Sequence, residues 1–432
     1  QPMNIIQRAE RFVQSLRDLA NKSAWDWRRC PYCKGTDTCG WGSYERHPWV
    51  LLEGRQVVRV ARHRCNSCKR TYSEESPWLI RRSWYARDVH RYAVDLWQHG
   101  GTSLRRGAEF VRSLIGRQER WLLWRVLGQA PAAEEQCHLA GSTVHRWLDG
   151  AGREAEKTVP GQLEGIGTSG NVGTDGLWAR LRGGAKAVVL ALVDTATGLI
   201  WPPTVAEGEE SAEFWRQMFK RAKVAGLDLN ALRGVVSDGA TGLVGCLQEI
   251  VKWVNHQRCV FHLWLKLGTE LARQVARVGV GLYGAAAKAA KERMRRELVG
   301  LIHAVLDAAS QQEAELALAK LRAHQLGAEL AQFLEAHLDA ALIHLNAYNK
   351  GLLRVGPEWL WRDFRLRLSH GRNHGTSARL ERAALVWAIY RNFTPAQWRS
   401  ERKRHYRRRG QSPLEAAGAS PGDISYLDAL AI

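Results

Sequence analysis

The feature that most constrains how this chain folds is the pattern of residues 171–265, where helical spacing gives way to short apolar runs. Such runs, bounded by glycine and turn residues, predict strands of a largely buried sheet. Pro202 and Pro203 make one strand irregular or place it at an edge. Ser211 is a suitable cap for a helix. The expected order is three strands, a helix, a strand, a helix and a strand, at 172–181, 185–193, 199–205, 211–219, 232–237, 241–254 and 257–261.

Two aspartates occupy matching places in these strands. Asp175 lies near the start of the first strand, and Asp238 closes the fourth. The order of elements is that of a ribonuclease-H-like α/β fold, in which the first and fourth strands are adjacent, so the two carboxylates would face each other. Carboxylates on neighbouring strands can share divalent metal ions, which phosphoryl transfer on a nucleic acid requires. A single strand-end aspartate is more often a cap or turn former, so the inference depends on the pair.

Four cysteines near the start of the chain have the spacing of metal ligands. Cys30 and Cys33 form one Cys-x-x-Cys pair, and Cys65 and Cys68 form a second, with a predicted strand at 57–60 between them. Two such pairs predict one structural Zn²⁺ in a zinc ribbon, which we assign with a short helix at 4–20 to residues 1–82. The alternative is two unrelated pairs of free or redox cysteines.

Residues 83–160 are predicted to be helical. A helix at 85–99, a break, a second helix capped by Ser103 and a short helix at 142–149 follow the order of a helix-turn-helix DNA-binding region. The last of these helices would present Thr143, His145 and Arg146 to DNA. The alternative is an ordinary helical bundle with a solvated polar face. The Gly-rich segment 150–170 is predicted to be a linker.

The charge of the chain favours a polyanionic partner. Lys and Arg number 63 against 43 Asp and Glu, which gives a formal net charge of +20. Such an excess suits nucleic acid, although a ribosome-associated or merely basic protein has the same balance. No apolar run reaches the length of a membrane span, and no signal peptide is visible. Cysteines in Cys-x-x-Cys pairs suit a reducing compartment, so we expect a cytoplasmic, nucleoid-associated protein.

Three motifs carry a resemblance to a known family. Gly-Thr-Asp175-Gly, Val-Val-Ser-Asp238-Gly-Ala-Thr-Gly and Cys259-Val-Phe-His262 resemble the core of prokaryotic DDE transposases of the Mutator-like insertion-sequence group. The resemblance implies a core whose first part spans 161–265, an all-helical insertion at 266–350, and a third acidic residue beyond it. Cys259 and His262 would support the active site, and the alternative is that they form half of a zinc site.

The resemblance leaves two candidates for the third acid. Glu358 starts a predicted helix directly after Pro357, and Glu381 lies on the next helix. Glu358 is preferred because its separation from Asp238 is closer to that of the group, and because Arg362 and Arg365 continue the helix as basic residues suited to DNA. Residues 351–396 would therefore complete the core.

The last segment, 397–432, is a basic tail. Arg402, Lys403 and Arg404 lie in a run of basic side chains interleaved with aromatics, which suits phosphate contact and stacking. A solvated charge run is the alternative.

The predicted function is that of a DNA transposase. Asp175, Asp238 and Glu358 would hold two Mg²⁺ ions that serve strand cleavage and strand transfer at the ends of an insertion sequence. The partners would be double-stranded DNA and a second copy of the chain. Two other functions remain open: a zinc-ribbon and helix-turn-helix regulator with an inactive core, and a structure-selective nuclease or resolvase.

Overall fold

The computed structural model describes residues 28–430 except 75, 118–124, 126–136, 279–282, 347–351, 357, 371–373, 396–409 and 423. The predicted helix at 4–20 and the basic residues Arg402, Lys403 and Arg404 lie outside the described residues. The chain divides into two compact units. The first is Gln1–Gly152 with Ser369–Gly371 and Leu427–Ile432, and the second is Arg153–Leu368 with Arg372–Tyr426.

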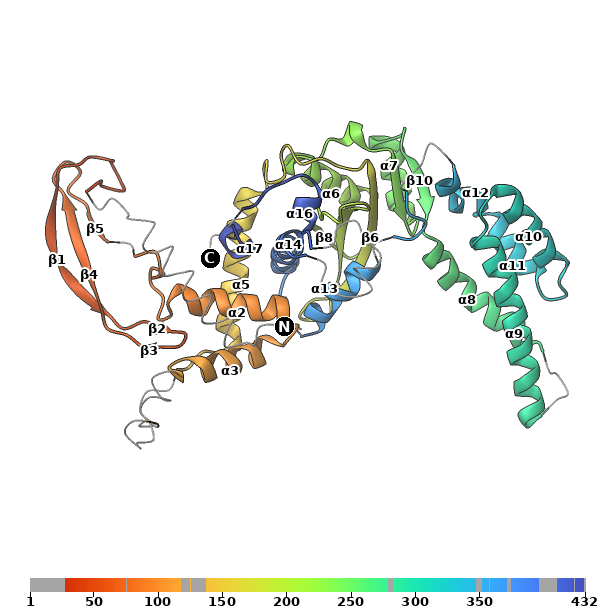
Figure 1. Ribbon diagram of the computed structural model, residues 1–432, viewed down its shortest axis with the longest axis horizontal. Coiled ribbons are helices and arrows are strands. Elements are labelled where there is room, and N and C mark those ends of the chain that lie inside the picture. Colours follow the sequence, from red (N-terminus) through yellow and green to blue (C-terminus); the bar gives the residue numbers. More distant parts are fainter. Residues whose placement is uncertain are drawn as a thin grey trace. The chain divides into compact units, whose positions relative to one another are not determined.

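The first unit opens with a three-stranded antiparallel sheet (Figure 1). Its strands, in the spatial order β1-β4-β5, are β1 (Thr38–Arg46), β4 (Val58–Cys65) and β5 (Thr71–Ser73). The predicted strand at 57–60 is therefore found, although it continues to Cys65. A two-stranded ribbon of β2 (Trp49–Val50) and β3 (Gly54–Arg55) follows β1 along the chain.

The helices of the first unit are α2 (Arg87–Gly100), α3 (Leu104–Leu114) and the start of α5 (Gly141–Thr158). Ser103 caps α3 as predicted, because its hydroxyl accepts the Arg106 N–H at 3.2 Å. The helices share a core that includes Val89, Val111 and Val144. The linker prediction was wrong for 150–158: α5 continues through these residues because Ala151 and Ala155 are buried, which outweighs the helix-weakening Gly150.

The second unit is built on a mixed five-stranded sheet in the order β10-β9-β6-β7-β8. Strands β6, β7 and β8 are antiparallel neighbours, whereas β9 and β10 run parallel to β6. The third strand is shorter than predicted, because it begins only after Pro202 and Pro203. The strands are β6 (Asn171–Arg180), β7 (Lys186–Asp194), β8 (Thr204–Glu207), β9 (Gly234–Ser237) and β10 (Asn255–Arg258).

Helices of the second unit cover this sheet. Helix α6 is capped by Ser211 as predicted, and it buries Trp215, Met218 and Phe219. Near the other end of the chain, Trp361 and Phe364 pack against Trp387, with the Phe364 and Trp387 ring centroids 4.6 Å apart. The helical elements are α6 (Ala212–Ala225), η1 (Leu229–Ala231), α7 (Thr241–Ile250), α13 (Glu358–His370), α14 (Ser377–Phe393), α16 (Pro413–Ala416) and α17 (Tyr426–Ala429), the last of which crosses the division between the units.

A helical segment interrupts the second unit between β10 and α13. Its described residues contain α8 (Val260–Ala276), α9 (Gly284–Leu306), α10 (Gln311–Ala323), α11 (Ala328–Glu335), α12 (Leu338–Ala341) and η2 (Ile343–Leu345), and no strand. Their leucines and alanines form one core. The strand predicted at 257–261 ends at Arg258 instead, because Val260 already begins α8 and buries its side chain in this helical core.

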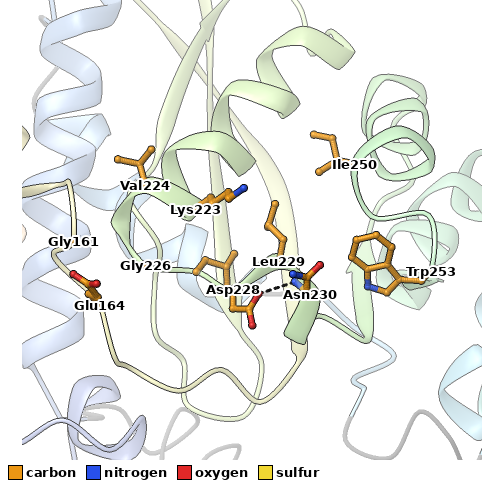
Figure 2. Close-up of a pocket in the computed structure, with 11 residues that line it drawn as sticks. Gly161, Glu164, Lys223, Val224, Gly226, Asp228, Leu229, Asn230, Ile250 and Trp253 are labelled. Carbon is orange, nitrogen blue, oxygen red and sulfur yellow. Dashed lines mark hydrogen bonds between the residues drawn. The ribbon is translucent and has the colours of Figure 1, made fainter.

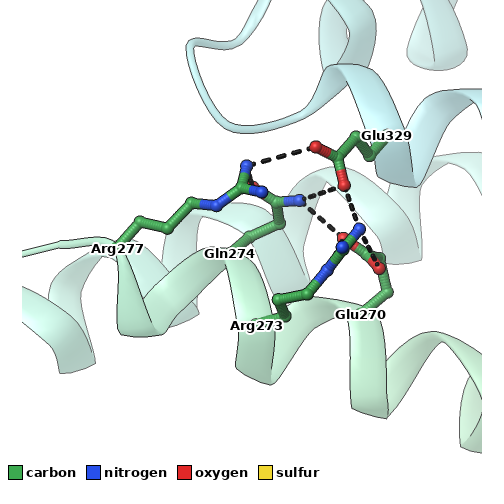
Figure 3. Close-up of polar contacts among 5 residues, drawn as sticks. All are labelled: Glu270, Arg273, Gln274, Arg277 and Glu329. Atoms are coloured by element: carbon green, nitrogen blue, oxygen red, sulfur yellow. Dashed lines mark hydrogen bonds and ion pairs between the residues drawn. The ribbon is translucent and has the colours of Figure 1, made fainter.

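Polar contacts join α8 to α11 at one place on the helical segment. Glu329 accepts a hydrogen bond from Gln274 at 2.8 Å and pairs with Arg277 at 3.1 Å (Figure 3). Arg273 also contacts Glu329. These arginines are half-exposed, so solvent screens their ion pairs, which contribute little beside the apolar core of the segment. None of the helices described is long and apolar enough to cross a membrane.

Candidate active site

The strand register brings the two predicted aspartates level with each other. Gly173 of β6 pairs with Val236 of the parallel strand β9, so continuing the register by two residues sets Asp175 opposite Asp238. Thr174 contacts Met218 of α6, and successive side chains of a strand alternate between faces. Asp175 therefore points to the face opposite α6.

The third predicted acid reaches the same place from α13. Ligand atoms of Asp175, His262 and Glu358 all lie within 4.8 Å of one another. His262 Nε2 is 3.3 Å from Glu358 Oε1. His262 lies in the first turn of α8, and Glu358 is the first residue of α13. Residues about 180 positions apart in the sequence thus meet at one end of the sheet, which no local pattern could show.

The electrostatics of this cluster favour a bound cation. Burial, and after it the neighbouring carboxylates of Glu358 and Asp238, raise the pKa of Asp175 to about 9. His262 Nδ1 is buried and has no hydrogen-bond partner among the described residues. Carboxylate oxygens that repel each other form a donor set that suits a divalent metal ion, whose charge would offset the repulsion, with His262 beside them.

Asp238 also has a local structural role. Its Oδ1 accepts the N–H of Ala240 at 2.9 Å, which shapes the turn into α7. Arg258 donates to the carbonyl of Gly239 at 2.8 Å and holds the same turn from β10. Since this bond involves only Oδ1, the second carboxylate oxygen of Asp238 is left for another ligand.

The Cys-x-x-His motif holds the segment that leads to Glu358. Cys259 Sγ accepts the N–H of Gly356 at 3.2 Å, and the N–H of Val260 donates to the carbonyl of Arg354 at 2.9 Å. Burial raises the pKa of the Cys259 thiol. Cys259 is outside the group of potential metal ligands, whereas His262 is inside it. The motif thus contacts both the backbone before Glu358 and its carboxylate.

Glu381, the other candidate acid, is engaged elsewhere. Its carboxylate accepts the N–H of Val205 at 2.8 Å and pairs with Arg221 of α6. These contacts tie α14 to β8 and α6. The geometry therefore groups Glu358, and not Glu381, with Asp175.

A fourth carboxylate near the site was missed by the sequence reasoning. Glu210 lies between β8 and α6, and burial followed by the charge of Asp238 raises its pKa to about 7. A Cβ at Gly176 would lie 2.2 Å from Glu210 Oε1, and a Cβ at Gly242 would lie 2.3 Å from the Glu210 carbonyl oxygen. Gly176, which follows Asp175, and Gly242, in the first turn of α7, thus make room for Glu210, although only the fold reveals this common neighbour.

The four predicted zinc ligands converge in the first unit. Cys30 Sγ is 3.6 Å from Cys68 Sγ, and Cys33 Sγ is 3.5 Å from Cys65 Sγ. A zinc–sulfur bond of about 2.3 Å in a tetrahedron sets the sulfurs about 3.8 Å apart, so the four thiols fit Zn²⁺. Each pair is followed by a lysine with positive φ, Lys34 at 63° and Lys69 at 60°. The two pairs thus end in tight turns of the same kind.

The residues predicted to contact DNA lie on exposed or partly exposed helix surfaces. On α5, Arg146 is exposed and donates to Thr143 Oγ1 at 3.1 Å, while His145 is partly exposed. On α13, Arg362 and Arg365 are both exposed. These positions leave the cationic groups accessible, but Thr143 is already engaged within its own helix.

A cavity of about 600 Å³ in the second unit is separate from this cluster. Lys223, Asp228 and Trp253 are among the residues that line it (Figure 2). It lies at the C-terminal ends of α6 and α7, whereas Glu210 and Asp238 precede their N-terminal ends. None of the predicted site residues lines it.

Comparison with known proteins supports the class of enzyme. Residues 203–281 match the model of a family described as transposase, Mutator family. The match includes Glu210, Asp238 and the Cys259–His262 motif, and it covers less than a fifth of the chain. It supports a Mutator-like transposase, a kind of enzyme that cleaves and transfers DNA. No curated protein matches the chain.

Proposed function

We propose that the chain is a DDE-type DNA transposase of prokaryotic insertion-sequence type, with Asp175, Asp238 and Glu358 as its acidic triad. The observation that carries the proposal is the meeting of Asp175 and Glu358, within a chain that matches a transposase family. Asp238 is outside this group of ligand atoms, but it is level with Asp175 on the neighbouring strand and its charge helps to raise the pKa of Asp175. The strand order β10-β9-β6-β7-β8 agrees with a ribonuclease-H-like core. The helical segment 266–350 is then an insertion into that core.

The three carboxylates would hold two Mg²⁺ ions. Bound there, the ions would activate water or a DNA 3′-hydroxyl as nucleophile and stabilise the leaving 3′-oxygen. Asp175 would supply its charge from a nearly buried position, where electrostatic interactions are strong. His262 and Cys259 would position Glu358, one through its carboxylate and the other through the backbone at Gly356.

DNA binding would depend on the basic surfaces outside the triad. We assign duplex contact to the helix-turn-helix region 83–160 through Thr143, His145 and Arg146, and to α13 through Arg362 and Arg365. Arg402, Lys403 and Arg404 of the tail would add contacts to phosphate. The one structural Zn²⁺ on Cys30, Cys33, Cys65 and Cys68 would stabilise residues 1–82, and two copies of the chain would act on paired element ends.

A nicking and joining assay tests the proposal. The full-length zinc-loaded protein is mixed with a labelled duplex carrying an element end, with Mg²⁺ or Mn²⁺. Asp175→Asn, Asp238→Asn and Glu358→Gln should each reduce nicking by at least about a thousandfold while retaining duplex binding. Asp339→Asn, at an exposed position of α12, is the matched control. Full nicking by Asp175→Asn would overturn the triad, and cleavage of branched DNA without joining would indicate a nuclease.

A further inference from the structure

A basic hollow lies on the zinc-ribbon sheet of the first unit. It has a volume of about 800 Å³ and is lined by residues of β1, β4 and β5 and of the segment that follows them. We call it the ribbon groove. Its lining includes Tyr44, Arg46, Arg62, Thr71, Ser73 and Arg81.

On β4, the residues that line the ribbon groove and the zinc ligand Cys65 lie on opposite faces. Near the cysteine cluster the lining also includes Pro31, Tyr32 and Tyr72. Side chains alternate along β4, so Val60, Arg62 and Arg64 share one face, while His63 and Cys65 share the other. The register pairs Val60 with Tyr44 and Arg62 with Ser73, all of which line the groove. The groove face is therefore free of the zinc ligand carried by β4.

Large aromatic side chains are exposed around this face. Trp41 is 47% exposed, Tyr44 41% and Tyr32 48%. The guanidinium of Arg64 lies 4.7 Å from the centre of the Trp41 ring, and that of Arg70 lies 5.1 Å from the Tyr32 ring. Exposed aromatics stacked with arginines are typical of surfaces that bind nucleic-acid strands.

The charged side chains that line the groove are mostly basic. Four arginines and one glutamate, Glu74, line it. Arg46 donates to the carbonyls of Ile80 and Ser83, and Arg87 donates to that of Pro77, so these two also shape the walls. Within the part of the chain that the structure describes, the side chains of Arg62 and Arg81 form no hydrogen bond or ion pair. Their guanidinium groups are available to an anion.

We infer that the ribbon groove binds the sugar–phosphate backbone of DNA, with Arg62 and Arg81 on phosphates and Tyr32 and Tyr44 against sugars or bases. An arginine guanidinium donates two parallel hydrogen bonds to phosphate oxygens, so arginines spaced along a groove with few carboxylates suit a nucleic-acid strand. The choice of DNA as the polyanion rests on the proposed function. The groove residues are distinct from those of α5 and α13.

Arg62→Glu and its matched control Arg59→Glu test this inference. Both arginines lie on β4 and the charge change is equal, but Arg59 is on the zinc face, where it donates to Ser43. Fluorescence anisotropy of the full-length protein on an element-end duplex should show at least about tenfold weaker binding for Arg62→Glu. Its log–log salt slope should fall by about one. Arg59→Glu should bind within about twofold of the parent.

The other outcomes are equally informative. Equal losses in both variants, with one zinc retained per chain, would mean that only net charge matters and would overturn the groove. An unchanged affinity in Arg62→Glu would do the same, as would a loss seen with RNA or an acidic peptide but not with DNA. Binding of single-stranded and duplex probes to the parent and to Tyr44→Ala shows which form of the DNA backbone the groove binds.

This test is independent of catalysis. Asp175→Asn should abolish nicking and still show the difference between Arg62→Glu and Arg59→Glu. If the parent protein fails to nick but Arg62 governs DNA binding, the proposed function falls and the groove stands. If nicking is confirmed and Arg62→Glu binds DNA as the parent does, the proposed function stands and the groove is overturned.

Discussion

His262 Nε2 lies 3.3 Å from Glu358 Oε1, across the gap between the first turns of α8 and α13. Cys259 accepts the N–H of Gly356, and His262, three residues later, contacts the carboxylate of Glu358. Two helix starts are thereby held together at the proposed metal site.

His262→Ala should loosen Glu358 without unfolding the protein. Because outer contacts orient metal-binding carboxylates, we expect about a 10–100-fold lower metal affinity or activity. The measurement is the Mn²⁺ concentration for half-maximal nicking together with Mn²⁺ binding by calorimetry. A shifted metal requirement, partly restored in His262→Gln, indicates positioning of Glu358. A lower rate with unchanged metal dependence would argue against it.

Asp175→Asn should stabilise the metal-free protein at alkaline pH. The folded-state pKa of about 9 lies above the ordinary 3.8, so the stability linked to the protonated carboxyl is complete below about pH 4 and is lost as pH rises toward 9. An asparagine does not ionise, so the free energy of unfolding of Asp175→Asn does not fall in this pH range. Each kcal/mol recovered corresponds to about 2–4 °C in Tm for a unit of this size.

Scanning calorimetry at pH 5 and pH 8, without added Mg²⁺, measures this effect. Asp175→Asn should exceed the parent in Tm at pH 8 and approach it at pH 5, where Asp175 is protonated. The exposed Asp339→Asn should show no such pH dependence. Added Mg²⁺ should raise the Tm of the parent and not that of Asp175→Asn. Equal Tm values at both pH values would contradict the burial of an ionisable Asp175.

Strands β7 and β9 were predictable because they are nearly continuous apolar runs. Strand β10 is polar, Asn255-His-Gln-Arg258, and overlaps the strand predicted at 257–261 by only two residues. The placement of Asp175 opposite Asp238 could be predicted from the two strands that carry them and from the adjacency of the first and fourth strands. The start of α8 was not predictable in the same way, because a short apolar run such as Cys259-Val-Phe can be strand or helix until its packing partners are known. The length of α5 was missed because Gly150 suggests a break, while burial of Ala155 depends on tertiary contacts.

Glu210 marks the limit of sequence reasoning at the site. It lies in a loop without a recognisable motif, and its relation to Asp238 arises from how β8 and α6 pack beside β6 and β9. The sequence signals Glu210 only through Gly176 and Gly242, because a side chain at either position would collide with Glu210. A lone glycine in a strand indicates a close approach but does not identify the approaching residue.

Glu210→Gln should therefore affect the site, although Glu210 lies outside the proposed triad. Removing a negative charge near Asp238 should weaken Mn²⁺ binding by several-fold and reduce nicking by about 10–100-fold. The matched control is Glu209→Gln, the exposed neighbour in the same loop. Calorimetric Mn²⁺ titration separates the effect on metal binding from the effect on rate. Equal behaviour of the two variants would exclude Glu210 from the site.

Removing zinc should unfold the ribbon and spare the second unit. The sheet β1-β4-β5 has a small core, in which Tyr72 packs with Cys30 and Cys65, so a tetrahedral metal site supplies much of its folding free energy. Cys65→Ser should lower bound zinc from about one ion per chain to near zero and make residues 28–73 sensitive to protease. Cys39→Ser, exposed on β1 and outside the cluster, should keep its zinc.

Because the triad belongs to the other unit, Cys65→Ser should still bind Mn²⁺ with the parent affinity. Zinc retained in full by Cys65→Ser would remove that residue from the ligand set.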